Sequence, residues 1–82
     1  MTDKQWNKYA EEGMKKASAA LNDKVFESHT QKEWKEMQEE AKERLDRRKN
    51  SGYYDNNPEA ALKDWTDLYT ALTFCYHYGN RM

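Results

Sequence analysis

The sequence predicts an all-α protein: one domain over residues 1–82, folded as a small antiparallel three-helix bundle. Three observations predict this class. Apolar residues recur at intervals of three and four in three stretches. Each stretch is bounded by residues that commonly begin or end helices. No segment alternates apolar and polar residues as a half-buried strand would. The chain is near the lower size limit for a core that is stable alone.

The first helix is expected over residues 3–22. Thr2 is a suitable N-cap, and Gln5 completes a capping box with it. The centre of the apolar stripe consists of small residues, so it should form a groove for a bulky ring such as Trp65 or Tyr69. The stripe contains Trp6, Ala10, Gly13, Met14, Ala17, Ala20 and Leu21.

The second helix is expected over residues 31–49, after a connector in which Val25 and Phe26 tuck under the end of the bundle. Thr30 and Glu33 form a second capping box. Acidic residues dominate the front of this helix and basic residues its back, which suits the helix dipole. Its apolar seam is narrow and contains Trp34, Met37, Ala41 and Leu45.

The third helix is expected over residues 58–78. Asn57 and Pro58 are typical of a helix start, and Gly79 is typical of a helix end. No other segment is as apolar, so the other two helices should pack against this one. Its broad apolar face contains Ala61, Trp65, Leu68, Tyr69, Leu72, Cys75 and Tyr76.

A second, smaller apolar strip is expected on the other side of the third helix. Phe74 lies well away from the broad face, with Ala71 and Tyr78 on the same side. The strip could pair two copies in a homo-oligomer or bind another protein, with Phe26 contributing. It could also be covered by the connector or by the C-terminal tail.

The composition favours the first of these three interpretations. The chain has three Trp, six Tyr, two Phe and four Met, but one Val and no Ile. Aromatic rings with polar groups are frequent at interfaces. A small chain with few aliphatic residues also gains stability by pairing exposed rings in a dimer.

A basic and aromatic cluster at the end of the second helix is a candidate anion or nucleotide site. Three arginines at positions i, i+3 and i+4 can converge on one anion, and the next helix begins nearby. The alternative is that these side chains only complement the helix dipole. The cluster consists of Arg44, Arg47, Arg48, Lys49, Tyr53 and Tyr54.

No catalytic, metal or cofactor site is expected. Cys75 and His77 are two residues apart on a helix, so they point in different directions. His29 and Glu33 could meet, but two ligands do not make a structural zinc site. The sequence therefore does not predict an enzyme.

These observations predict a small cytoplasmic protein that acts by stoichiometric binding to another protein. Virus-encoded inhibitors of host enzymes or defence systems are frequently of this kind. The alternative is sequestration of a nucleotide or other small phosphate-containing ligand in an oligomer. A net charge of -1 argues against nucleic acid. No apolar run is long enough for a membrane span, and the single cysteine fits a reducing compartment.

Overall fold

The computed structural model describes residues 2–81, with side chains described as far as His77. All regular structure in this range is helical, which confirms the all-α class. The helices are α1 (Asp3–Ala19), α2 (Asp23–Glu27), α3 (Gln31–Ser51), α4 (Tyr53–Asn56) and α5 (Pro58–Arg81). A count of three helices was therefore incomplete, because α2 and α4 occupy segments expected to be irregular connectors.

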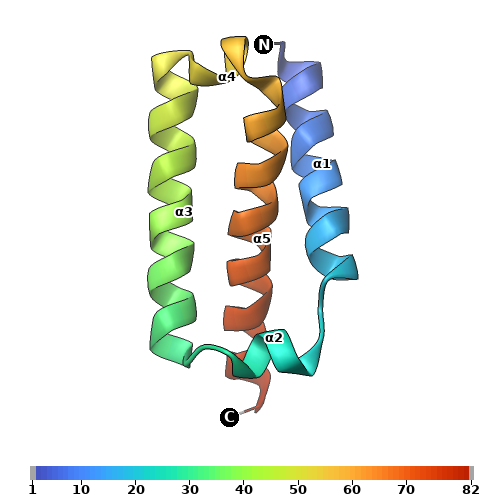
Figure 1. Ribbon diagram of the computed structural model, residues 1–82, viewed down its shortest axis with the longest axis vertical. Coiled ribbons are helices and arrows are strands. Elements are labelled where there is room, and N and C mark those ends of the chain that lie inside the picture. The colour runs from blue at the N-terminus through green and yellow to red at the C-terminus, as the bar shows by residue number, and fades with distance from the viewer. Residues whose placement is uncertain (1, 82) are drawn as a thin grey trace.

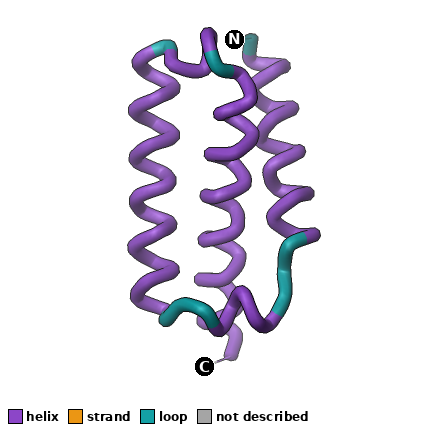
Figure 2. The backbone as a smooth tube through the Cα atoms, in the orientation of Figure 1, coloured by secondary structure: helices purple, strands orange, loops and turns teal. Residues whose placement is uncertain are grey.

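Helix α5 lies between α1 and α3 and packs along both of them (Figure 1). Helices α1 and α5 run in the same direction, and α3 runs in the opposite one. Helix α2 crosses near the C-terminal end of α5, and α4 lies at the other end of the molecule. The long helices have short connections at their ends (Figure 2), and the Cα atoms span 40 × 22 × 17 Å.

Both predicted capping boxes are confirmed. The backbone N–H of Gln5 donates to Thr2 Oγ1 at 3.3 Å, and the N–H of Thr2 donates to Gln5 Oε1 at 3.2 Å. Thr30 and Glu33 make the same pair of bonds at the start of α3. Gly52 ends α3 with a φ of 77°, a left-handed conformation that glycine adopts without a steric penalty.

Three helix ends differ from the sequence prediction, and α3 continues to Ser51 rather than residue 49. Helix α1 stops at Ala19 because Asn22 starts a new helix: its Oδ1 accepts a hydrogen bond from the N–H of Val25 at 2.8 Å. Gly79 was expected to end the last helix, but α5 continues to Arg81. A glycine therefore does not end a helix by itself.

Helices α1 and α5 approach closely at Gly13, inside the predicted groove of small residues. A Cβ atom at Gly13 would lie 2.7 Å from Trp65 Cβ and 3.0 Å from the backbone nitrogen of Thr66. The Trp65 ring stacks on Tyr69 at 5.3 Å between centroids and meets the edge of Trp6 at the same distance. The Trp6–Trp65 contact joins α1 to α5, whereas the Trp65–Tyr69 stack lies within α5.

The α3–α5 interface is centred on a stack of rings. Trp34 stacks on Phe74 with 4.4 Å between centroids, and Phe26 of α2 lies 5.6 Å from Phe74. Trp34 Nε1 donates a hydrogen bond to the carbonyl of Phe26 at 3.1 Å, which fixes α2 against α3. Phe74 is only 2% exposed, and Ala71 beside it is also buried.

The expected exposed strip at Phe74 is thus wrong. Phe74, Ala71 and Phe26 are core residues. This agrees with the interpretation in which the connector, which contains Phe26, covers the strip. Conversely, Leu72 and Tyr76, which were expected in the core, are 37% and 70% exposed. The reason is that α5 contacts partners on two sides, so its buried face is displaced toward Ala71 and Phe74. The side chain of Tyr78 lies outside the described residues.

Replacing Gly13 with alanine should destabilise the protein, although alanine is the better helix former by about 1 kcal/mol. The added methyl group meets backbone atoms of α5, and overpacking of this kind costs about 1–3 kcal/mol. Thermal unfolding measures the change. Ser18→Ala, on the exposed side of α1, is the control and should not lower the melting temperature. An equal rise for both variants would contradict the close approach.

Candidate functional site

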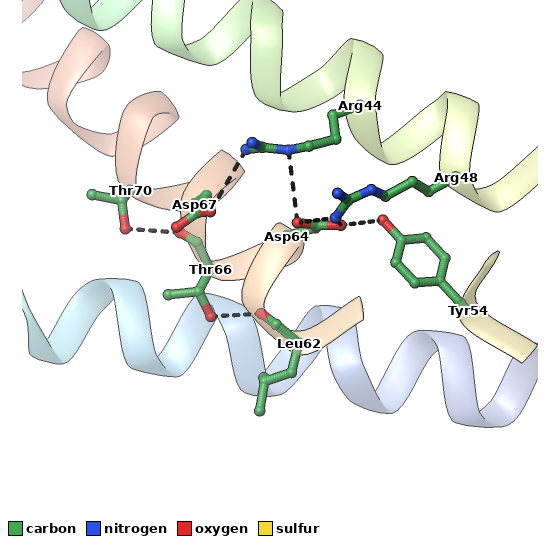
Figure 3. Close-up of polar contacts among 8 residues, drawn as sticks. All are labelled: Arg44, Arg48, Tyr54, Leu62, Asp64, Thr66, Asp67 and Thr70. Atoms are coloured by element: carbon green, nitrogen blue, oxygen red, sulfur yellow. Dashed lines mark hydrogen bonds and ion pairs between the residues drawn. The ribbon is translucent and has the colours of Figure 1, made fainter. Parts of the chain in front are cut away.

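The centre of the polar structure is Asp64, a carboxylate that is 2% exposed within the most apolar helix. Tyr54 Oη donates a hydrogen bond to Asp64 Oδ2 at 2.6 Å. Arg48 Nη1 donates to both carboxylate oxygens, at 3.0 and 3.3 Å. Figure 3 shows the donors approaching from α3 and α4. The buried charge is therefore paired and hydrogen-bonded, as burial of an ion requires.

This arrangement shifts the pKa values of both donors. Burial, and then the hydrogen bond to Asp64, raises the pKa of Tyr54 well above its ordinary value. The hydrogen bond to Asp64 also raises the pKa of Arg48. Tyr54 is thus held as a neutral phenol and Arg48 as a cation, which is the charge state that the buried carboxylate needs.

Arg44 extends the cluster toward the surface. Its Nε lies 3.7 Å from Asp64 Oδ1, and its Nη2 lies 3.6 Å from Asp67 Oδ2 (Figure 3). The Nε atom is buried and has no hydrogen-bond partner. Arg44 therefore contributes charge near Asp64 without a directed hydrogen bond, and it does not pair with Glu40 on its own helix.

Of the three arginines predicted to converge on an external anion, the structure places two on an internal carboxylate. Arg44 and Arg48 face Asp64, and the Tyr54 ring is buried. Arg47 and Lys49 are exposed instead. Two of the cations have aromatic neighbours: the guanidinium carbon of Arg48 lies 4.6 Å from the Tyr53 ring centroid, and Lys49 Nζ lies 4.9 Å from that of Trp6. The residues are close together, but two of the four cations face an internal carboxylate.

Sequence reasoning missed Asp64, although a signal was present. An aspartate lies between Ala61 and Leu68 on the row of α5 that is most buried. A single acid on an apolar row indicates either a site or a buried ion pair. Arg44 and Arg48, which are four residues apart on the neighbouring helix, would have indicated a buried ion pair rather than a site.

The threonines of α5 satisfy their own hydroxyl groups. Thr66, Thr70 and Thr73 each donate at 2.7 Å to the carbonyl four residues earlier. Figure 3 shows the first two of these bonds. These hydroxyl groups are therefore engaged within the helix and offer no free donor to a ligand.

A shallow hollow of about 370 Å³ lies between α3 and α5, beside the Arg44 end of the cluster. Trp34, Met37 and Ala41 provide apolar lining, while Arg44 and Asp67 on its edge pair with each other. Arg44 and Asp67 thus partly neutralise each other's charge. The lining of the hollow therefore does not select one class of ligand.

Metal and nucleophile chemistry gain no support from the described part of the chain. No group of three or more His, Cys, Asp or Glu residues there could hold a metal ion. His29 Nδ1 lies 3.3 Å from Glu33 Oε2, so the two anticipated residues do meet. Burial raises the pKa of the Cys75 thiol, and nearby Lys35 offsets part of this rise. Such a thiol is a poor nucleophile at neutral pH.

One apolar surface that is exposed in the described part of the chain lies on α5, and we call it the α5 strip: Leu72, Cys75 and Tyr76. Tyr76 and Leu72 are one turn apart, and Cys75 between them is half-buried. Their row continues from the buried Leu68. The strip is thus the edge of the core that α1 and α3 leave uncovered.

Comparisons of the chain with protein families, curated proteins and solved structures find no match. Among the helices as far as they are described, none has the length and apolar character required to cross a membrane. The candidate sites of this protein are therefore argued from its own geometry.

Asp64→Asn should lower the free energy of unfolding by about 1.5–3 kcal/mol, since it weakens charge-assisted hydrogen bonds in the interior. Chemical denaturation measures the loss. Asp67→Asn removes an equal charge at the exposed end of the cluster and should change stability by less than about 0.5 kcal/mol. Equal effects of the two substitutions would show that the internal carboxylate has no special role.

Stability should fall as the pH rises above about 10, the ordinary pKa of tyrosine. The folded state raises the pKa of Tyr54, so the unfolded chain releases this proton first, and ionisation then favours unfolding. Tyr54→Phe should be less stable than the parent near pH 7 and should lose less stability between pH 9 and about 11. The exposed Tyr53 provides the matched control, Tyr53→Phe, whose alkaline profile should follow that of the parent.

Proposed function

We propose that this protein is not an enzyme and acts by stoichiometric binding to another protein through the α5 strip. The supporting observation is the 70% exposure of Tyr76 beside the partly exposed Leu72 on the central helix. Tyrosine is enriched at interface centres because it buries a large area and keeps a polar group. A row that continues directly from the core also presents its contacts on a rigid element.

The shape of the molecule supports this proposal. The accessible surface is 5878 Å², whereas a compact monomer of this mass exposes about 5200 Å². The radius of gyration is 13.3 Å, compared with about 12 Å for a compact chain of this length. The molecule is thus more elongated than a compact monomer and exposes more surface for its mass.

The α5 strip could also pair two copies of the chain in a homo-oligomer. The expected dimer surface at Phe74 is buried, so a pair of copies would have to meet at Leu72 and Tyr76 instead. A contact of this kind would be isologous if it is closed by a two-fold axis. Binding to a different protein and dimerisation would then compete for one surface.

The remaining expectations stay part of the proposal. A small cytoplasmic binder would suit a virus-encoded inhibitor of a host enzyme or defence system, which needs affinity and no catalytic group. No specific observation supports the sequestration of a nucleotide or anion, because Arg44, Arg48 and Tyr54 contact Asp64. Only Arg47, Lys49 and Tyr53 would remain available for it.

The double variant Leu72→Ser/Tyr76→Ser tests the proposed function. It should keep its helical content but lose binding to a captured partner by at least about 30-fold, as expected when an interface loses about 2 kcal/mol. Affinity of the purified pair is measured by calorimetry. Met37→Ser is the matched control, because Met37 of α3 is 38% exposed and lies beside the hollow between α3 and α5.

The proposed function would be contradicted by a saturable partner whose affinity is the same for the parent, the double variant and the control. It would also be contradicted if neither a protein partner nor self-association were found at tens of micromolar concentration. Sedimentation of the parent and the double variant separates the dimer from the heteromeric complex.

A further inference from the structure

The charge beside the α5 strip indicates what kind of partner it receives, provided that the proposed function holds. Helix α3 carries Lys35, Lys42 and Lys49 at intervals of seven residues. Residues at this spacing lie on nearly the same side of a helix, about 10.5 Å apart along its axis. All of these lysines are exposed, so they form a basic row along one edge of α3.

One contact and one electrostatic effect show where this row lies. The charge of Lys35 lowers the pKa of the Cys75 thiol, which belongs to the strip, although burial raises it more. Lys49 Nζ lies 4.9 Å from the centroid of the Trp6 ring, which itself contacts Trp65 of α5. By contrast, Arg44 and Met37 line the hollow with Asp67 and Thr70, on a different side of α5 from Leu72.

The antiparallel register places one lysine beside the α5 strip and a second one further along the same edge. Arg48 contacts Asp64, and further along the pair of helices Trp34 stacks on Phe74. Interpolation between these contacts places Lys35 level with the turn of α5 that carries Leu72, and Lys42 level with Leu68, the buried residue from which the strip continues. The strip and the turn before it therefore have ammonium groups along their α3 edge.

The other edge of the strip has a different character. Gly13 of α1 meets Trp65 and the two helices run in the same direction, so the uncharged Ser18 is level with Thr70, just before the strip, and α1 ends at Ala19. On α3, Glu39 and Asp46 follow Lys35 and Lys42 by one turn and lie further round the helix. The lysines are thus the charged residues of α3 nearest to the strip, while α1 ends before the level of Tyr76.

We propose that the α5 strip binds an amphipathic helix of a partner protein, with apolar residues on one face and acidic residues along the edge that meets α3. Apolar anchors one turn apart on a helix match the spacing of Leu72 and Tyr76. Carboxylates along the edge complement Lys35 and Lys42, and this complementarity selects the partner and its direction. A second copy fits less well, since the charged residues of α3 nearest to its own strip are lysines rather than carboxylates.

Three designed peptides of about five helical turns test this inference. They share one leucine-rich face and differ only in the residues that flank it, which are glutamate, glutamine or lysine. Fluorescence anisotropy of the labelled peptides measures binding to the full chain. The glutamate peptide should bind at least about tenfold tighter than the glutamine peptide, and added salt should reduce the difference. The lysine peptide should bind most weakly.

Variants assign the effect to the named residues. Lys35→Glu/Lys42→Glu should reverse the order of the glutamate and lysine peptides. Arg47→Glu is the matched control, because this exposed cation of α3 lies on another side of the helix, more than three turns from Lys35, and should leave the order unchanged. Leu72→Ser/Tyr76→Ser should weaken all three peptides at least tenfold.

The possible failures are distinguishable. Equal binding of the three peptides, lost in the Leu72/Tyr76 variant, would overturn the acidic partner and leave the proposed binding surface intact. If the Leu72/Tyr76 variant still binds the peptides with the same dependence on their charge, the binding surface is not the α5 strip. A dimer that the variant dissociates, without binding of any peptide, would assign the strip to a second copy. A monomer that binds no peptide overturns the inference, and the captured-partner experiment then decides the proposed function.

Discussion

The structure depends on one constraint: a single strongly apolar helix must serve as the packing partner of two others. Helices α1 and α3 have narrow apolar stripes, and both place them against α5. The α1 contact depends on close backbone approach at Gly13, whereas the α3 contact depends on stacked rings. Because the two partners lie on opposite flanks of α5, neither covers the row that ends in Tyr76.

The buried carboxylate adds specificity to this packing. Asp64 receives hydrogen bonds from α3 and α4, whose donors are fixed along the axis of the molecule. A slip of one helical turn between α3 and α5 would move Arg48 by about 5.4 Å and leave Asp64 buried without this donor. Apolar contacts tolerate such a slip more easily, so the ion pair would discriminate against alternative registers.

The sequence predicted what depends on neighbouring residues, and it failed where distant elements decide. The capping boxes at Thr2 and Thr30 were predictable because they involve residues three apart. The helical wheel of α5 was correct as geometry. However, the side that is buried depends on where α1 and α3 lie, so Phe74 and Tyr76 exchanged roles. Likewise, an isolated guanidinium group on a wheel does not reveal that a carboxylate on another helix faces it.

The threonines of α5 have a consequence for how this helix is recognised. Each hydroxyl group bonds to the carbonyl of its own preceding turn, so the side chain is left with its methyl group for neighbours to touch. Hydropathy scales rate threonine as polar, yet an approaching molecule would mainly contact the methyl groups of these side chains. These three threonine side chains therefore need no hydrogen-bond partner from a neighbouring helix, unlike Asp64.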